Sequence, residues 1–155
     1  MSTPPCESRR RAPPADDMKR LLQIISLAAL VGSSAQAQVS NYQVVGDGIP
    51  QSLTGGPGDP ARGRALLVKR DPANCLTCHS IKDLPPGGTK GPALDGVGAA
   101  LTVAQIRLSV VDMSRVDRGT PMPSFHKSGG LTGSGPTLSA AQVEDVVAYL
   151  ASLKK

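Results

Sequence analysis

Cys75, Cys78 and His79 place two thiols three positions apart, with an imidazole directly after the second thiol. This spacing is typical of the attachment of a c-type haem, in which each thiol forms a thioether with one vinyl group of the porphyrin. The histidine that follows provides the proximal ligand to the iron. We therefore predict one covalently bound haem c, attached through Cys75 and Cys78 and ligated by His79.

Other interpretations also fit a pair of closely spaced thiols. A dithiol redox site, and hence a thiol oxidoreductase, uses the same spacing but does not require the histidine. A zinc site needs two more ligands, but Cys6 precedes the expected leader and His126 lies far along the chain from His79. In an oxidising compartment the two thiols could instead form a disulfide, as they would transiently before haem attachment.

The composition favours a fold built around a flat cofactor. The 155 residues include one Phe, two Tyr and no Trp, too few aromatic side chains for a core of the usual kind. A buried porphyrin would supply the missing apolar mass. The 17 glycines and 14 prolines are many for a compact domain. We expect an all-α fold of short helices and long loops around one haem.

Residues 18–37 have the pattern of a secretory signal peptide. A basic start precedes an eleven-residue apolar run and a small-residue cleavage site that ends at Ala37. The apolar run is too short to span a bilayer, so we expect no stable membrane insertion. Residues 1–17 form a polar extension that is non-native or untranslated if Met18 rather than Met1 is the start. The chain is predicted to reach the periplasm.

Cleavage after Ala37 lowers the formal net charge from +5 to +3. The basic residues form no stripe with interleaved aromatic side chains, so we expect no nucleic-acid partner.

The mature chain divides into an arm and one domain. Residues 38–58 are rich in glycine and proline and are predicted to form an irregular arm. Because this arm has too little apolar content for a core of its own, we expect it to lie along a partner. Residues 59–155 form the domain itself.

The domain begins with a helix signal. Asp59 is a suitable N-cap and Pro60 suits the first helical position, so a helix is predicted from there to about Arg70. Gly63 has no Cβ and would allow another helix to cross closely, with Tyr149 as its expected neighbour.

Two later stretches carry capping boxes. Thr102 is followed by Gln105, and Ser139 by Gln142, each with an apolar run beyond. One helix is predicted to end near Asp112 and the other to reach the C-terminus. The apolar face of the second helix comprises Val143, Val146, Val147, Leu150 and Leu153.

Two further residues, Pro92 and Met122, complete the predicted haem site. We expect the Pro92 carbonyl to accept a hydrogen bond from the His79 Nδ1–H, since a metal-bound histidine needs such an acceptor. Met122 precedes Pro123, which favours an extended backbone that can present its thioether to the iron as the distal ligand. Met113, at a helix end beside charged residues, and His126 are the alternatives.

Several motifs together resemble those of a known family. The order of helix, CxxCH, Gly-Pro loop, Met loop and C-terminal helix over residues 59–155 resembles a class I cytochrome c. The amino-acid sequences of several segments are similar to those of the SoxX family. These segments are DPARG at 59–63, NCLTCH at 74–79, GPALDGVG at 91–98, RLSVVD at 107–112, Met122-Pro123 and VEDVVAYL at 143–150. One departure is Phe125-His126, where two aromatic residues are expected.

The resemblance implies a function. SoxX is the monohaem subunit of the SoxAX complex, whose SoxA subunit joins thiosulfate oxidatively to a cysteine of a carrier protein, an L-cysteine S-thiosulfotransferase reaction. The resemblance therefore implies a heterodimer with a SoxA-like cytochrome, in which this chain accepts electrons for a downstream carrier cytochrome and is not the catalytic centre. The alternatives are a freely diffusing cytochrome c and the cytochrome subunit of another periplasmic dehydrogenase.

Overall fold

The computed structural model describes residues 40–69, 71–127 and 135–155. The expected extension at 1–17 and the expected signal peptide at 18–37 lie outside these residues.

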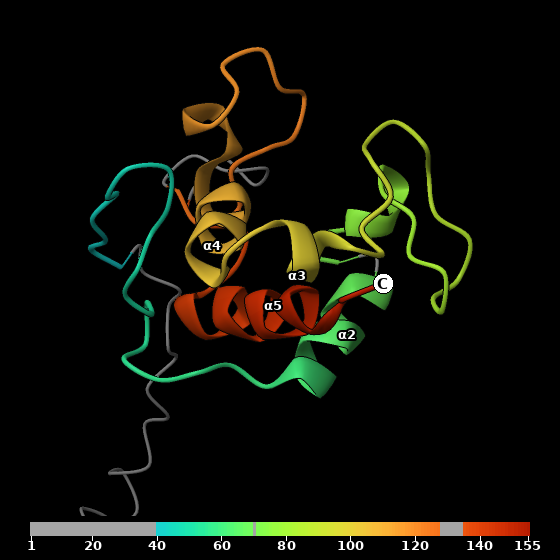
Figure 1. Ribbon diagram of the computed structural model, residues 1–155, viewed down its shortest axis with the longest axis horizontal. Helices are drawn as coiled ribbons and strands as arrows, with labels where there is room; N and C mark the ends of the chain where they lie inside the picture. Colours follow the sequence, from blue (N-terminus) through green and yellow to red (C-terminus); the bar gives the residue numbers. More distant parts are fainter. Residues whose placement is uncertain (1–39, 70, 128–134) are drawn as a thin grey trace, which may run out of the picture. The chain divides into compact units, whose positions relative to one another are not determined.

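The described residues form an all-α fold, as predicted, in which one helix contacts all the others (Figure 1). The last helix, α5, packs against α2, α3 and α4. Within the described ranges, the backbone pairs in strand fashion only at the isolated bridge between Val45 and Gly48. The helices are α2 (Pro60–Val68), α3 (Val97–Ala100), α4 (Val103–Asp112) and α5 (Ala140–Ser152), with 3-10 turns η1 (Cys75–Thr77) and η2 (Met113–Arg115).

The predicted helix starts are confirmed by their caps. The Asp59 side chain accepts hydrogen bonds from the first turn of α2, and both predicted capping boxes are present, at Thr102 and Ser139. Two of the helices were predicted to extend too far. Helix α2 ends at Val68 because the next residue is already extended, and α5 ends at Ser152 rather than at the C-terminus.

The core lies between α4 and α5. Side chains from both helices are almost fully buried there, and full burial of one such side chain stabilises the fold by roughly 1.5–3 kcal/mol. The main contributors are Ile106, Leu108, Val111, Val143, Val146 and Val147. Among the described residues, no helix combines the length and the apolar content that crossing a membrane requires.

Helix α2 crosses α5 at Gly63, as predicted. A Cβ at Gly63 would collide with the Asp145 carbonyl oxygen and lie 2.9 Å from the Tyr149 Cβ. The Asp145 carboxylate fixes the same crossing, because it accepts hydrogen bonds from the Arg62 guanidinium at 2.8 and 2.9 Å and from the Asp59 N–H at 2.7 Å. The bond from Arg62 holds the pKa of Asp145 below its usual value.

The arm contributes to the core of the domain that follows it, and its expected place along a partner stays a prediction. The Ile49 side chain is fully buried. Arg107 of α4 and Glu144 of α5 form a buried ion pair with N–O distances of 2.8 and 3.0 Å. The Arg107 guanidinium also donates to the Ile49 carbonyl, and Glu144 accepts from the Leu53 N–H. This pairing of distant residues fastens the arm to α4 and α5.

Replacing Gly63 with alanine tests the helix crossing. The added methyl group should force α2 away from α5 and lower the free energy of unfolding by about 1–3 kcal/mol, although alanine favours a helix by about 1 kcal/mol over glycine. The measurement is denaturant unfolding of the haem-loaded protein. Gly56→Ala is the control, because a Cβ there meets nothing within 4 Å. Equal stability of Gly63→Ala and wild type would contradict the close crossing.

Candidate haem-binding site

The predicted attachment residues lie in one tight turn that follows α2. Asn74 adopts a left-handed backbone conformation (φ 39°, ψ 47°) and starts the 3-10 turn η1. The amides of Cys78 and His79 both donate to the Cys75 carbonyl, at 3.2 and 3.0 Å. Both cysteines are half-buried and free. The turn therefore holds two thiols and an imidazole close together along the chain.

The state of the Cys75 thiol does not suit a dithiol redox site. The pKa of Cys75 is raised to about 11, mainly by burial; a backbone hydrogen bond lowers it and the nearby Cys78 adds a smaller increase. A redox-active cysteine needs a stabilised thiolate and therefore a lowered pKa. This observation disfavours the thiol oxidoreductase alternative.

The loop after the turn fixes the His79 ring. The His79 Nδ1 lies 2.8 Å from the Pro92 carbonyl oxygen, the contact predicted from the sequence. Because a carbonyl can only accept, Nδ1 carries the proton, and Nε2 keeps the lone pair that a metal requires.

Gly91 also shapes this contact, and the sequence analysis gave it no role. Its amide donates to the Cys78 carbonyl at 2.8 Å, and a Cβ there would lie against the His79 ring, 2.7 Å from Nδ1. The only signal in the sequence was the glycine directly before Pro92.

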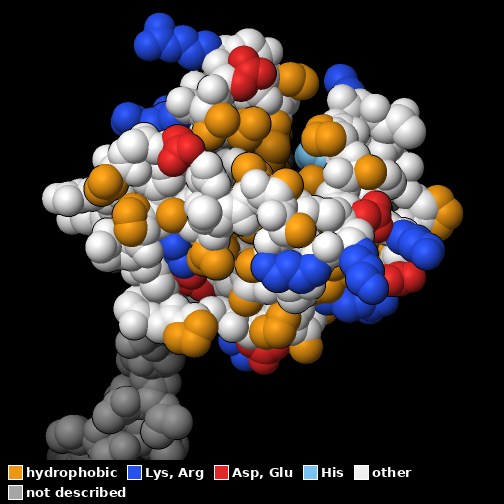
Figure 2. Space-filling model, viewed as in Figure 1, with side chains coloured by type: hydrophobic (Ala, Val, Ile, Leu, Met, Phe, Trp, Pro, Cys, Tyr) orange, Lys and Arg blue, Asp and Glu red, His pale blue; other side chains and the backbone are white. Residues whose placement is uncertain are grey.

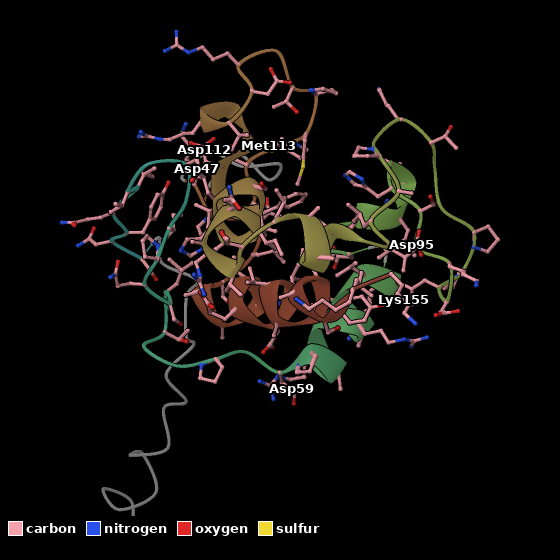
Figure 3. All side chains as sticks on the ribbon, in the orientation of Figure 1. Asp47, Asp59, Asp95, Asp112, Met113 and Lys155 are labelled. Carbon is pink, nitrogen blue, oxygen red and sulfur yellow. The ribbon has the colours of Figure 1, made fainter. Side chains whose placement is uncertain are left out.

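Met122 lies at a bend between Pro121 and Pro123. Its side chain is half-buried against the hydrophobic core, and its amide donates to the Thr120 hydroxyl at 3.1 Å. Met113 sits where α4 meets η2 (Figure 3) and is not among the residues packed on that core.

His126, the other alternative ligand, has both ring nitrogens engaged. The ring is fully buried, with Nδ1 2.8 Å from the Leu138 carbonyl oxygen. Nδ1 must carry the proton, so Nε2 accepts the hydrogen bond from the Ser40 N–H at 2.9 Å. A metal bond at His126 would require one of these bonds to break. In the described part of the chain, no three His, Cys, Asp or Glu side chains come together as a metal site.

Figure 2 shows a hollow in this face between the segment after α4 and the segment after η1. Hydrophobic side chains line it, and one histidine is visible there. Two free thiols and an imidazole with an available nitrogen are the groups that attach and ligate haem c, and an apolar hollow suits its porphyrin. The residues present therefore fit this cofactor.

Comparisons with known proteins show which family the chain resembles. The cytochrome c family model matches residues 60–154. A chain in the crystal structure of SoxXA from P. pantotrophus is 36% identical, covering 74% of this chain and 95% of that chain, with a TM-score of 0.67. The c-type cytochrome SorU from Sinorhizobium meliloti is 22% identical, covering 61% and 88%, with a TM-score of 0.43. That score is too low to carry an argument.

Curated protein sequences give no match. Membership of the matched family implies a covalent haem c at the CxxC of Cys75 and Cys78. The family model covers most of the described residues, and the SoxXA chain agrees in both sequence and fold. The chain therefore belongs to the cytochrome c family.

Proposed function

We propose that this chain is the monohaem subunit of a SoxXA-type complex and accepts electrons during thiosulfate or sulfur oxidation in the periplasm. The observation that carries the proposal is the 36% identity to a SoxXA chain over 95% of that chain's length. The catalytic centre then belongs to a SoxA-like partner, and a downstream carrier cytochrome receives the electrons.

Each site residue has a role in this proposal. Cys75 and Cys78 would form the two thioethers to haem c, and His79 Nε2 would ligate its iron. The Pro92 carbonyl orients the imidazole and makes Nε2 a stronger donor to the metal. Gly91 leaves room for the ring beside this loop.

Met122 is the distal ligand in this proposal. Haem c supplies one-electron transfer when bound, at a potential set largely by its axial ligands. Ligation by a thioether together with an imidazole would raise that potential, which suits an electron acceptor. If His79 and Met122 both held the iron, it would have no site left for a substrate. The chain is therefore an electron conduit rather than a catalyst.

Replacing Met122 with alanine tests the distal ligand. The oxidised protein should lose the weak red charge-transfer band of an iron–thioether bond. Its reduction potential should fall, within the roughly 0.8 V range that axial ligands span. Met113→Ala is the matched control and should change neither the band nor the potential. An unchanged spectrum in Met122→Ala would move the ligand role to Met113 or His126.

Co-expression with a SoxA-like cytochrome tests the partner. We expect light scattering to give the mass of a stable one-to-one complex. A stable interface of this kind buries at least about 1,200 Å² of surface. Each haem-loaded protein measured alone is the control. Truncation of the arm is unsuitable here because Ile49 belongs to the core. If both proteins are haem-loaded and remain monomeric when mixed, the chain is a freely diffusing carrier instead.

A further inference from the structure

Asp112 occupies the junction between α4 and the segment that carries Met122. It is the last residue of α4, and its backbone (φ −156°, ψ 82°) separates α4 from η2. Its side chain is almost fully buried, although the residues that follow it, 114–119, are exposed. Figure 3 shows it at the end of α4 where the chain turns away from the helix. A buried carboxylate at this point needs partners.

Its partners come from both ends of the segment 113–127. Oδ1 accepts hydrogen bonds from the Ser114 hydroxyl at 2.5 Å and the Ser124 hydroxyl at 2.7 Å. Oδ2 lies 3.3 Å from the Lys127 ammonium and 3.8 Å from the Arg115 guanidinium. One carboxylate thus joins the start of the segment to its end.

The backbone supports the same closure. The amides of Phe125 and His126 donate to the carbonyls of Val110 and Val111, both at 3.3 Å, so the returning chain lies against the last turn of α4. Asp112 follows those two carbonyls directly and adds the side-chain contacts. The part of the segment that returns to α4 is therefore held at several adjacent residues.

Ser124 transmits this restraint to Met122. Only Pro123 separates the two residues, and its ring fixes one of the backbone angles between them. Met122 is itself restricted to extended geometry because a proline follows it. A tether on Ser124 therefore limits where the thioether can lie.

Burial raises the pKa of Asp112, yet the bonds from Ser114, Ser124 and Lys127 together bring it below its usual value. The carboxylate is therefore a charged acceptor at neutral pH, and hydrogen bonds to a charged group are stronger than neutral ones.

We propose that Asp112 is the positioning residue for Met122, closing the segment 113–127 so that the thioether is held at the iron. This inference rests on the proposed ligation by Met122. A thioether is a weak neutral ligand whose binding depends on its effective concentration at the metal. A loosened segment lowers that concentration and lets an external ligand compete.

The test uses Asp112→Asn and Ser124→Ala in the haem-loaded, oxidised protein. Both should weaken the iron–thioether band and raise the affinity for added imidazole by about tenfold or more. Ser124→Thr keeps a hydroxyl and should restore wild-type behaviour. Asp117→Asn is the charge-matched control, because Asp117 is exposed in the same segment and its side chain accepts a hydrogen bond from the nearby Gly119 amide.

The outcomes separate this inference from the proposed function. If Met122→Ala loses the band but Asp112→Asn and Ser124→Ala keep the wild-type band and imidazole affinity, the positioning role is wrong and the ligation stands. If Met122→Ala keeps the band, the ligation itself fails. Should Asp112→Asn not fold, the two Ser124 variants decide the question. A lower melting temperature with unchanged imidazole affinity would show a merely structural role and overturn the proposal.

Discussion

The close crossing of α2 and α5 at Gly63 is the constraint on which the haem site depends. Helix α2 leads into the turn that carries Cys75 and His79, so the crossing fixes where that turn begins. Helix α5 also supports α4, from whose end the Met122 segment departs. Both walls of the hollow are therefore attached to one helix. A small domain with few aromatic side chains can in this way present groups from distant parts of its sequence to one cofactor.

Buried charges fix the junctions between these elements. Arg107 and Glu144 fasten the arm to α4 and α5, Asp145 fastens the start of α2 to α5, and Asp112 closes the segment beyond α4. Each carboxylate accepts bonds from residues far away in the chain or from both ends of a loop. Removing one partner of such a group is costly because a charge is left buried. These contacts specify which segments meet, while the apolar side chains supply most of the burial.

Local signals made much of the fold and site predictable from the sequence. The caps at Asp59, Thr102 and Ser139 act within a few residues, and so does the CxxCH spacing. Contacts between distant residues were harder to predict. The burial of Ile49, the Arg107–Glu144 pair and the bonds of His126 each depend on a partner that no local pattern identifies. The composition of the arm did not indicate this packing, since Ile49 is its one fully buried hydrophobic side chain among the described residues.

The central claim is that this cytochrome c carries one haem bound covalently through Cys75 and Cys78. Its most direct test is the mass of the mature protein, produced in a host that matures c-type cytochromes, then denatured and extracted with acidified solvent. We predict that the haem stays with the polypeptide and adds one haem to its mass, located by fragmentation on the peptide that contains both cysteines. Haem that extracts completely, leaving the mass of the bare polypeptide, would contradict the account.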